Sequence, residues 1–217
     1  MGRKYSHENR YKIIKASFSL FLEHGYPNVT TRMIADACGI QRSLLHHYYQ
    51  KKEQILLDVY LDICRAIYAY CLNALNREQF ETLDVNIFFR IIYEVMQIRP
   101  VYKNIYMTIY RDATLLYKIL SFAVDNNDFF GLPPFSQEKK RAVFMVCGSL
   151  SQLVLLYEAK AVEMSARDLI NYAMHGYYFH LGFNKAKTQH FIDRVNEIIT
   201  EKYVLGFIAY YEDKMFN

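Results

Sequence analysis

The sequence predicts an all-α fold, in which an N-terminal three-helix unit with a helix-turn-helix precedes an all-helical body. Three observations favour this class. Gly and Pro are rare, with 8 and 4 residues in a chain of 217, which is typical of long helices and not of a many-turned sandwich or barrel. Apolar residues recur with helical spacing along most of the chain, and no period-two alternation is long enough for a strand. About nine to ten helices are expected.

The first helix is expected from about His7 to His24. Its apolar positions recur with helical spacing and predict a buried face. These positions are Ile13, Ile14, Phe18, Phe21 and Leu22. Gly25 ends this helix, and residues 26–28 form a turn because Pro27 cannot extend a helix and biases its neighbour away from one.

The segment from Thr30 to Lys52 predicts two short helices joined by a glycine turn. Thr30 or Thr31 can cap the first of them by accepting a hydrogen bond from an otherwise unpaired backbone N–H. Gly39 can adopt the left-handed conformation that ends a helix. The apolar face of this helix is expected at Met33, Ile34 and Ala37.

The second short helix is expected from about Gln41 to Tyr49, with Leu45 and Tyr49 facing inward. The residues left on its outer face are Arg42, Ser43, His46 and His47, and Lys51 and Lys52 follow directly. A short helix with a buried seam and an outer face of cations and hydrogen-bonding groups has the chemistry that reads a DNA major groove.

The body is expected to start with a long helix from Lys52 to about residue 76. No Gly or Pro separates it from the preceding helix, so the join between the two parts is short and stiff. Further helices are expected over residues 83–98, 101–127 (one long or two shorter), 136–162, 165–181 and 188–210. The chain therefore divides into a helix-turn-helix domain, residues 1–53, and a helical ligand-binding and dimerisation domain, residues 54–217.

The positive charge is concentrated in the N-terminal part. Residues 1–53 hold nine Lys and Arg against four acidic residues, a net charge of +5, whereas residues 54–217 hold 17 basic and 18 acidic residues. This asymmetry suits a polyanion-binding domain on a neutral body. Scatter over a solvated surface is the alternative, and charge alone does not choose between them.

The cysteines and the apolar segments favour a cytoplasmic protein without a membrane span. The four cysteines form no CxxC pair, and Cys64 and Cys71 would lie about 10 Å apart on a helix, too far for a disulfide. No apolar segment of the secretory type stands at the N-terminus. The longest largely apolar run, from Ala142 to Tyr157, is short for a membrane span and fits a buried helix.

Signatures of enzymes and of metal sites are missing from the sequence. It contains no Gly-rich phosphate loop, no G-x-S-x-G and no H-E-x-x-H, which argues against an enzyme. His46 and His47 are adjacent and would point about 100° apart on a helix, so they cannot chelate together. His175 and His180 are five residues apart and miss the i, i+4 spacing of a helical zinc pair. Neither a metal nor a cofactor is expected.

The first 56 residues resemble the TetR family of one-component bacterial transcription regulators. The residues that match are Gly25, the run from Thr30 to Ala35, Ala37, Gly39, Ile40, Leu45, Tyr49, Lys52 and Glu53. The resemblance implies a homodimer whose second short helices enter successive major grooves of a palindromic operator. It also implies a small-molecule pocket in the body, and a repressor that is released from DNA when an effector binds there.

Carried over by position, the resemblance implies that Arg32, Arg42 and Ser43 reach base edges. Phosphates would be held by Thr31, His46, His47, Tyr48 and Lys52. The full DNA-binding set is Thr30, Thr31, Arg32, Arg42, Ser43, His46, His47, Tyr48 and Lys52. The family commonly has Tyr at the positions of His46 and His47, and a polar residue at the position of Leu44. These departures keep open an alternative, in which the helix-turn-helix has lost DNA and binds another protein.

The body holds 15 of the 20 tyrosines, more phenol groups than a core easily satisfies, because each buried hydroxyl needs a partner. This predicts a tyrosine-lined pocket for an aromatic or amphipathic small molecule, although helically spaced aromatics are also typical of a plain core. The proposed pocket residues are Phe88, Tyr93, Tyr106, Tyr110, Tyr117 and Met145. Dimerisation is expected through the helices at 136–162 and 165–181, and the small residues 147–149 suit either the pocket or the dimer seam.

Overall fold

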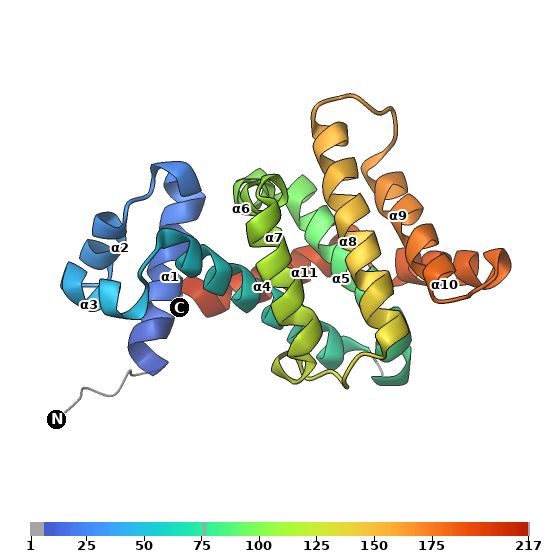
Figure 1. The fold of residues 1–217 in the computed structure, drawn as a ribbon, viewed down its shortest axis with the longest axis horizontal. Helices are drawn as coiled ribbons and strands as arrows, with labels where there is room; N and C mark the ends of the chain where they lie inside the picture. The colour runs from blue at the N-terminus through green and yellow to red at the C-terminus, as the bar shows by residue number, and fades with distance from the viewer. Residues whose placement is uncertain (1–6, 76, 217) are drawn as a thin grey trace.

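The computed structural model describes residues 7–75 and 77–216, and within these ranges the fold is all-helical, which confirms the predicted class (Figure 1). Residues 1–6, which carry Arg3 and Lys4 of the basic excess, lie outside the described residues. The α-helices are α1 (His7–His24), α2 (Thr31–Ala37), α3 (Arg42–Tyr48), α4 (Lys52–Ala74), α5 (Arg77–Ile98), α6 (Pro100–Arg111), α7 (Ala113–Asp125), α8 (Gln137–Glu158), α9 (Ala166–His180), α10 (Lys185–Ile198) and α11 (Glu201–Phe216). Two 3-10 helices are also present, η1 (Tyr26–Asn28) and η2 (Asn127–Phe130).

Two differences from the expected helices have local causes. The segment expected as one helix from 188 to 210 is two helices, because Ile199 leaves the helical conformation and the Thr200 hydroxyl accepts a hydrogen bond from the Tyr203 N–H at 3.3 Å as a new N-terminal cap. Pro100 opens α6 at its first position, where the missing N–H costs nothing. With the expected segment 101–127 also divided into α6 and α7, the described α-helices number eleven.

The first three helices lie at one end of the molecule (Figure 1), and their buried residues belong to the core cluster that continues into the body. The Thr30 hydroxyl caps α2 by accepting a hydrogen bond from the Met33 N–H at 3.2 Å. Gly39 has φ of 64°, the left-handed conformation expected for a residue that ends a helix. The buried face of α2 is formed by Ile34 and Ala35, whereas Ala37, which was expected to face inward, is exposed.

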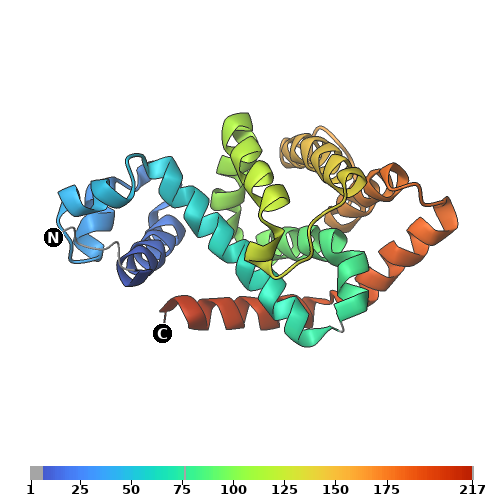
Figure 2. The same cartoon turned by 60° about the horizontal axis from the view of Figure 1, so that its bottom comes forward.

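Helix α11 is a second connection between the N-terminal helices and the body. Figure 2 shows it running back beside α4 toward α1. In its last turns, Tyr211 donates a hydrogen bond to Asp62 of α4 at 3.2 Å, and the Lys214 ammonium lies 3.0 Å from both oxygens of the same carboxylate. The Tyr211 ring also packs against Phe18 of α1, with 5.3 Å between ring centroids. The stiff join at α4 is therefore not the whole connection.

At the other end, helices α8 and α9 lie side by side, and α9 and α10 are fixed to α5 by Arg90. This side chain is 1% exposed. It donates hydrogen bonds to the Arg167 carbonyl at 3.3 Å, to the Asn196 side-chain oxygen at 2.9 Å, and to the side-chain oxygen of Asn171. One buried cation thus orients two helices of the body.

By length and composition, α8 is apolar enough to cross a membrane. Its inner face, however, packs into the core of the protein against α6, α7 and α9. The buried residues are Ala142, Val143, Val146, Cys147, Leu150, Ser151 and Val154. Burial of this face in the helical body explains part of its apolar composition.

Candidate nucleic-acid interface and effector cavity

Helix α3 is fixed on its inner side and presents its predicted outer side to solvent. Leu45 and Tyr49 are buried in the N-terminal core, as expected from their spacing. The exposed residues of the helix are Arg42, Ser43, His46 and His47. Four of the residues expected to meet DNA therefore share one solvent-facing surface.

A hydrogen-bonded cluster holds the end of α3 against α1 and α4. The Tyr49 hydroxyl donates to Asp58 of α4 at 2.5 Å, and burial raises the pKa of Tyr49, so that it stays protonated and can donate. Arg10 of α1 donates to both oxygens of the same carboxylate at 2.9 Å. Tyr48 is half-buried and accepts a hydrogen bond from Asn9 at 3.3 Å. The bidentate pair of Arg10 and Asp58 fixes the orientation of the two helices more firmly than a simple ion pair would.

Lys52, which was expected to hold a phosphate, makes its contacts in this structure within the protein. Its ammonium donates to the carbonyls of Tyr26 at 2.8 Å and Val29 at 2.9 Å, and it lies 4.2 Å from the centre of the Tyr26 ring. Burial lowers the pKa of Lys52. The side chain thus ties the turn after α1 to the start of α4, and the neighbouring Lys51 is the exposed cation at this point.

The remaining residues of the predicted set lie around the start of α2. Arg32 is exposed and its Nε lies 3.8 Å from Asp36, one turn on along the same helix. Thr31 is partly exposed. The Thr30 hydroxyl accepts the capping hydrogen bond of α2. Thr30 therefore belongs to the predicted DNA-binding set because of its position in the sequence and not because its hydroxyl is free.

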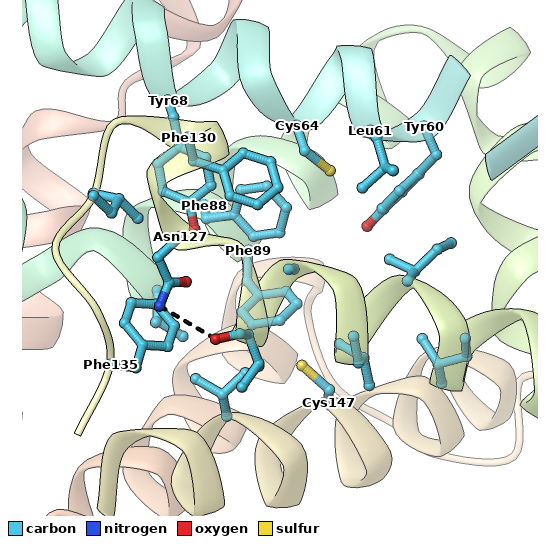
Figure 3. A pocket seen from close by; sticks show the side chains of 18 of the residues that line it. Tyr60, Leu61, Cys64, Tyr68, Phe88, Phe89, Asn127, Phe130, Phe135 and Cys147 are labelled. Carbon is cyan, nitrogen blue, oxygen red and sulfur yellow. Dashed lines mark hydrogen bonds between the residues drawn. The ribbon is translucent and has the colours of Figure 1, made fainter. Parts of the chain in front are cut away.

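A cavity lies in the body between α4, α5, α6, α7 and α8 (Figure 3). The residues that line it are Tyr60, Leu61, Cys64, Tyr68, Val85, Phe88, Phe89, Tyr110, Leu116, Ile119, Leu120, Ala123, Val124, Asn127, Phe130, Leu132, Phe135, Val143, Cys147 and Leu150. The space between them is about 750 Å³ when its open part is included. Apolar cavities with few polar groups are typical of small-molecule sites.

Two of the six proposed pocket residues, Phe88 and Tyr110, line this cavity. Tyr93 and Tyr106 are buried outside its lining, and each has a hydroxyl without a hydrogen-bond partner. Tyr117 and Met145 are 65% and 56% exposed, because each lies on the outer side of its helix. Helical spacing shows which residues share a face but not which face turns inward. For this reason only some of the six proposed residues line the cavity.

Except for Tyr110, the sequence reasoning missed the polar groups of the cavity, above all Asn127. Burial raises the pKa of the Cys64 and Cys147 thiols and of the Tyr60, Tyr68 and Tyr110 phenols. These groups therefore stay neutral at physiological pH. A signal for Asn127 was present in the Asn126-Asn127-Asp128 run before the Phe129-Phe130 pair, since such a run is typical of a turn next to buried aromatics.

The outer sides of α8 and α9 form an apolar surface. On α8 the exposed residues recur every three or four positions and include Met145, Gly148, Ser149 and Leu156, and on α9 they include Tyr172, Gly176 and Phe179. Tyr172 and Phe179 are 64% and 73% exposed. Cys147 turns to the cavity while Gly148 and Ser149 turn outward, so the small residues of α8 serve both regions. We call this surface the α8–α9 face.

The N-terminal residues match a known family at the level of sequence. Residues 13–59, which run from within α1 into α4, match the model of the family described as bacterial regulatory proteins, tetR family. No curated protein matches the chain.

Solved structures with a similar fold include several from this family. A TetR transcriptional regulator from Rhodococcus sp. RHA1 has a TM-score of 0.60 at 14% identity, covering 80% of this chain and 96% of its own. SmeT, the repressor of the Stenotrophomonas maltophilia multidrug efflux pump SmeDEF, has a TM-score of 0.48 at 15% identity, covering 80% and 88%. A putative tetR family regulator from Shewanella sp. PV-4 has a TM-score of 0.43 at 15% identity, covering 95% and 97%. At these identities the likeness concerns the fold alone.

Proposed function

Because the chain belongs to the TetR family of bacterial regulatory proteins, we propose that it is a cytoplasmic repressor that binds a palindromic operator as a homodimer and is released by a small molecule. Proteins of this family are transcription factors and not enzymes. In the proposal, residues 1–53 form the DNA-binding domain and residues 54–217 the effector-binding and dimerisation domain.

The observation that carries the proposal is the outer surface of α3. Arg42 and Ser43 stand in its first turn and are exposed. A recognition helix in the major groove contacts base edges with its N-terminal residues. We assign Arg42 to a guanine edge and Ser43 to a neighbouring base, with Arg32 as a further base contact. His46, His47 and Lys51 are exposed and supply phosphate contacts. Thr31 is partly exposed and is a further candidate for a phosphate.

Dimerisation is assigned to the α8–α9 face. Large apolar side chains are depleted at the surface of monomers unless the surface binds a partner. At the two glycines of this face, Gly148 and Gly176, an added Cβ atom would meet no side chain or neighbouring backbone within 4 Å, so a second helix can approach closely there. Two helices from each subunit would then form a four-helix bundle.

The effector is assigned to the cavity, and α4 links it to the DNA-binding domain. Helix α4 supplies Tyr60, Leu61, Cys64 and Tyr68 to the lining. At its start, Lys52 holds the turn after α1. If α4 can take two positions, a ligand that binds the protein more tightly in one of them would favour that position. The spacing of the two DNA-binding domains in the dimer would then shift. Helix α11 must follow this movement, because it is bonded to Asp62 of α4.

The DNA contacts are tested with Arg42→Ala and Lys51→Ala on a duplex that the wild-type protein selects from a random pool. Loss of a bidentate Arg–guanine contact costs about 1–3 kcal/mol, so Arg42→Ala should weaken binding to the selected duplex about 5- to 150-fold for each half-site. Its binding to a shuffled duplex should change far less. Lys51→Ala should weaken binding to both duplexes alike and reduce the salt dependence by about one phosphate contact per subunit. Fluorescence anisotropy at several salt concentrations measures all four affinities.

Lys187→Ala is the matched control, since Lys187 is an exposed lysine at the start of α10, where it lies 4.7 Å from the Phe183 ring. It should leave both affinities unchanged. Equal losses from Arg42→Ala on selected and shuffled DNA would refute the assignment of Arg42 to a base. Absence of any selected duplex would instead favour the protein-binding alternative.

A further inference from the structure

The wall of the cavity selects against charge. Among the described residues that line it, none is Asp, Glu, Lys, Arg or His. A charged ligand would lose its hydration there and gain no ion pair, which is costly. The cysteine thiols and tyrosine phenols stay protonated because burial raises their pKa, so they add no charge and the thiols are not poised to attack an electrophile.

One side of the cavity is built of aromatic rings that suit a flat molecule. The rings of Tyr68 and Phe88 are stacked with 5.2 Å between centroids and 10° between planes. Phe88 and Phe89 meet edge to face at 5.4 Å. Such rings bind a further ring in offset or edge-to-face geometry. The space of about 750 Å³, which includes its opening, has room for a molecule of one or two rings.

Asn127 places a buried, unpaired acceptor in this apolar wall. The residue is 5% exposed. Its side-chain N–H donates to the Val124 carbonyl at 3.3 Å. The oxygen of the same amide has no hydrogen-bond partner. Figure 3 shows the oxygen turned toward the space beside Phe89. A buried acceptor without a partner is unfavourable, and a donor on a ligand would relieve it.

We propose that the cavity binds an uncharged planar molecule of one or two rings, with one O–H or N–H group that donates a hydrogen bond to the Asn127 side-chain oxygen. This rests on the proposed function, in which the cavity is the effector site. It deepens that function by naming the class of effector and by making Asn127 the residue that selects it. Carboxylates and ammonium compounds are excluded from the class.

Three probes of one shape test the class. 4-Ethylphenol carries the donor, 4-ethyltoluene replaces the hydroxyl with a methyl group, and 4-ethylbenzoate carries a negative charge. Their binding to the wild-type protein without DNA is measured by isothermal titration calorimetry. We expect 4-ethylphenol to bind about 10-fold more tightly than 4-ethyltoluene, because one hydrogen bond to a buried acceptor contributes about that factor in affinity. We expect 4-ethylbenzoate to bind most weakly. Equal binding of the phenol and the toluene, tighter binding of the benzoate, or no binding of any probe overturns the proposal.

Two variants locate the donor's partner. Asn127→Leu keeps the approximate size and removes the acceptor, so the preference for 4-ethylphenol over 4-ethyltoluene should disappear. Asn126→Leu is the matched control: its side chain likewise donates to a carbonyl at the end of α7, that of Phe122 at 2.9 Å, but does not line the cavity. It should keep the preference. Persistence of the preference in Asn127→Leu overturns the role of Asn127. If this variant fails to fold, the three probes on the wild-type protein still decide the ligand class.

DNA release is measured separately, so that the two proposals can fail independently. If 4-ethylphenol binds with the expected preference and leaves DNA affinity unchanged, the ligand class stands and the effector role fails. If DNA is bound specifically but the probes show no preference, the ligand class alone fails.

Discussion

Replacing Arg90 with alanine is expected to lower the free energy of unfolding by about 3 kcal/mol, a large loss for one residue. The guanidinium is buried and donates to the Arg167 carbonyl and to the side chains of Asn171 and Asn196. Burial lowers the pKa of Arg90 to about 10, so it remains protonated at neutral pH and the bonds are charge-assisted. Its removal leaves three acceptors on α9 and α10 unpaired and opens a cavity.

Urea denaturation followed by circular dichroism measures this loss, at one fixed protein concentration because a dimer's stability depends on it. Arg194→Ala is the control on α10, since Arg194 is exposed and pairs with Glu197 at 3.0 Å, a contact worth less than about 1 kcal/mol. Arg90→Met separates size from polarity: it fills most of the volume but leaves the acceptors unpaired, and should keep most of the loss. A stability of Arg90→Ala equal to that of Arg194→Ala would contradict the role given to Arg90.

Replacing Phe179 with aspartate is expected to convert the proposed dimer into a monomer and to weaken operator binding about 100-fold. Phe179 is among the most exposed large apolar residues of the α8–α9 face. A carboxylate buried in the dimer interface without a partner would cost several kcal/mol. A monomer then loses the second half-site, whose linkage is worth about 100-fold or more in avidity.

Analytical ultracentrifugation gives the oligomeric state, and anisotropy on the selected duplex gives the affinity. Tyr117→Asp is the matched control, because Tyr117 is a similarly exposed aromatic residue on α7, outside the α8–α9 face. It should remain dimeric and bind DNA as the wild type does. A dimeric Phe179→Asp protein with unchanged DNA affinity would place the dimer interface elsewhere.

The N-terminal helices could be predicted closely because their signals are local. The hydroxyl of Thr30, the left-handed Gly39 and the i, i+4 pair Leu45 and Tyr49 each act within a few residues. These features depend on backbone geometry and on a single periodic face, both of which a sequence displays directly. The prediction was wrong at Ala37, which is exposed, whereas Ala35 is buried beside Ile34.

The body was predicted less well because its decisive contacts join distant residues. Nothing in the sequence around Arg90 shows that its partners stand on α9 and α10. The contact of Lys214 with Asp62 spans 152 positions, and the local pattern gives no sign of it. The position of Lys52 in the sequence predicts a phosphate contact. In the structure its ammonium donates hydrogen bonds to backbone carbonyls that only the folded turn brings near.

The central claim is that α3 reads a palindromic sequence as part of a dimer. Selection from a pool of random duplexes at about 0.1 M salt, where phosphate contacts still contribute, tests it most directly. We predict enrichment of one inverted repeat, bound by two chains, about 1,000-fold or more tighter than shuffled DNA, with half-sites about 34 Å apart. A pool without an enriched sequence, and equal affinity for selected and shuffled duplexes, would contradict the claim.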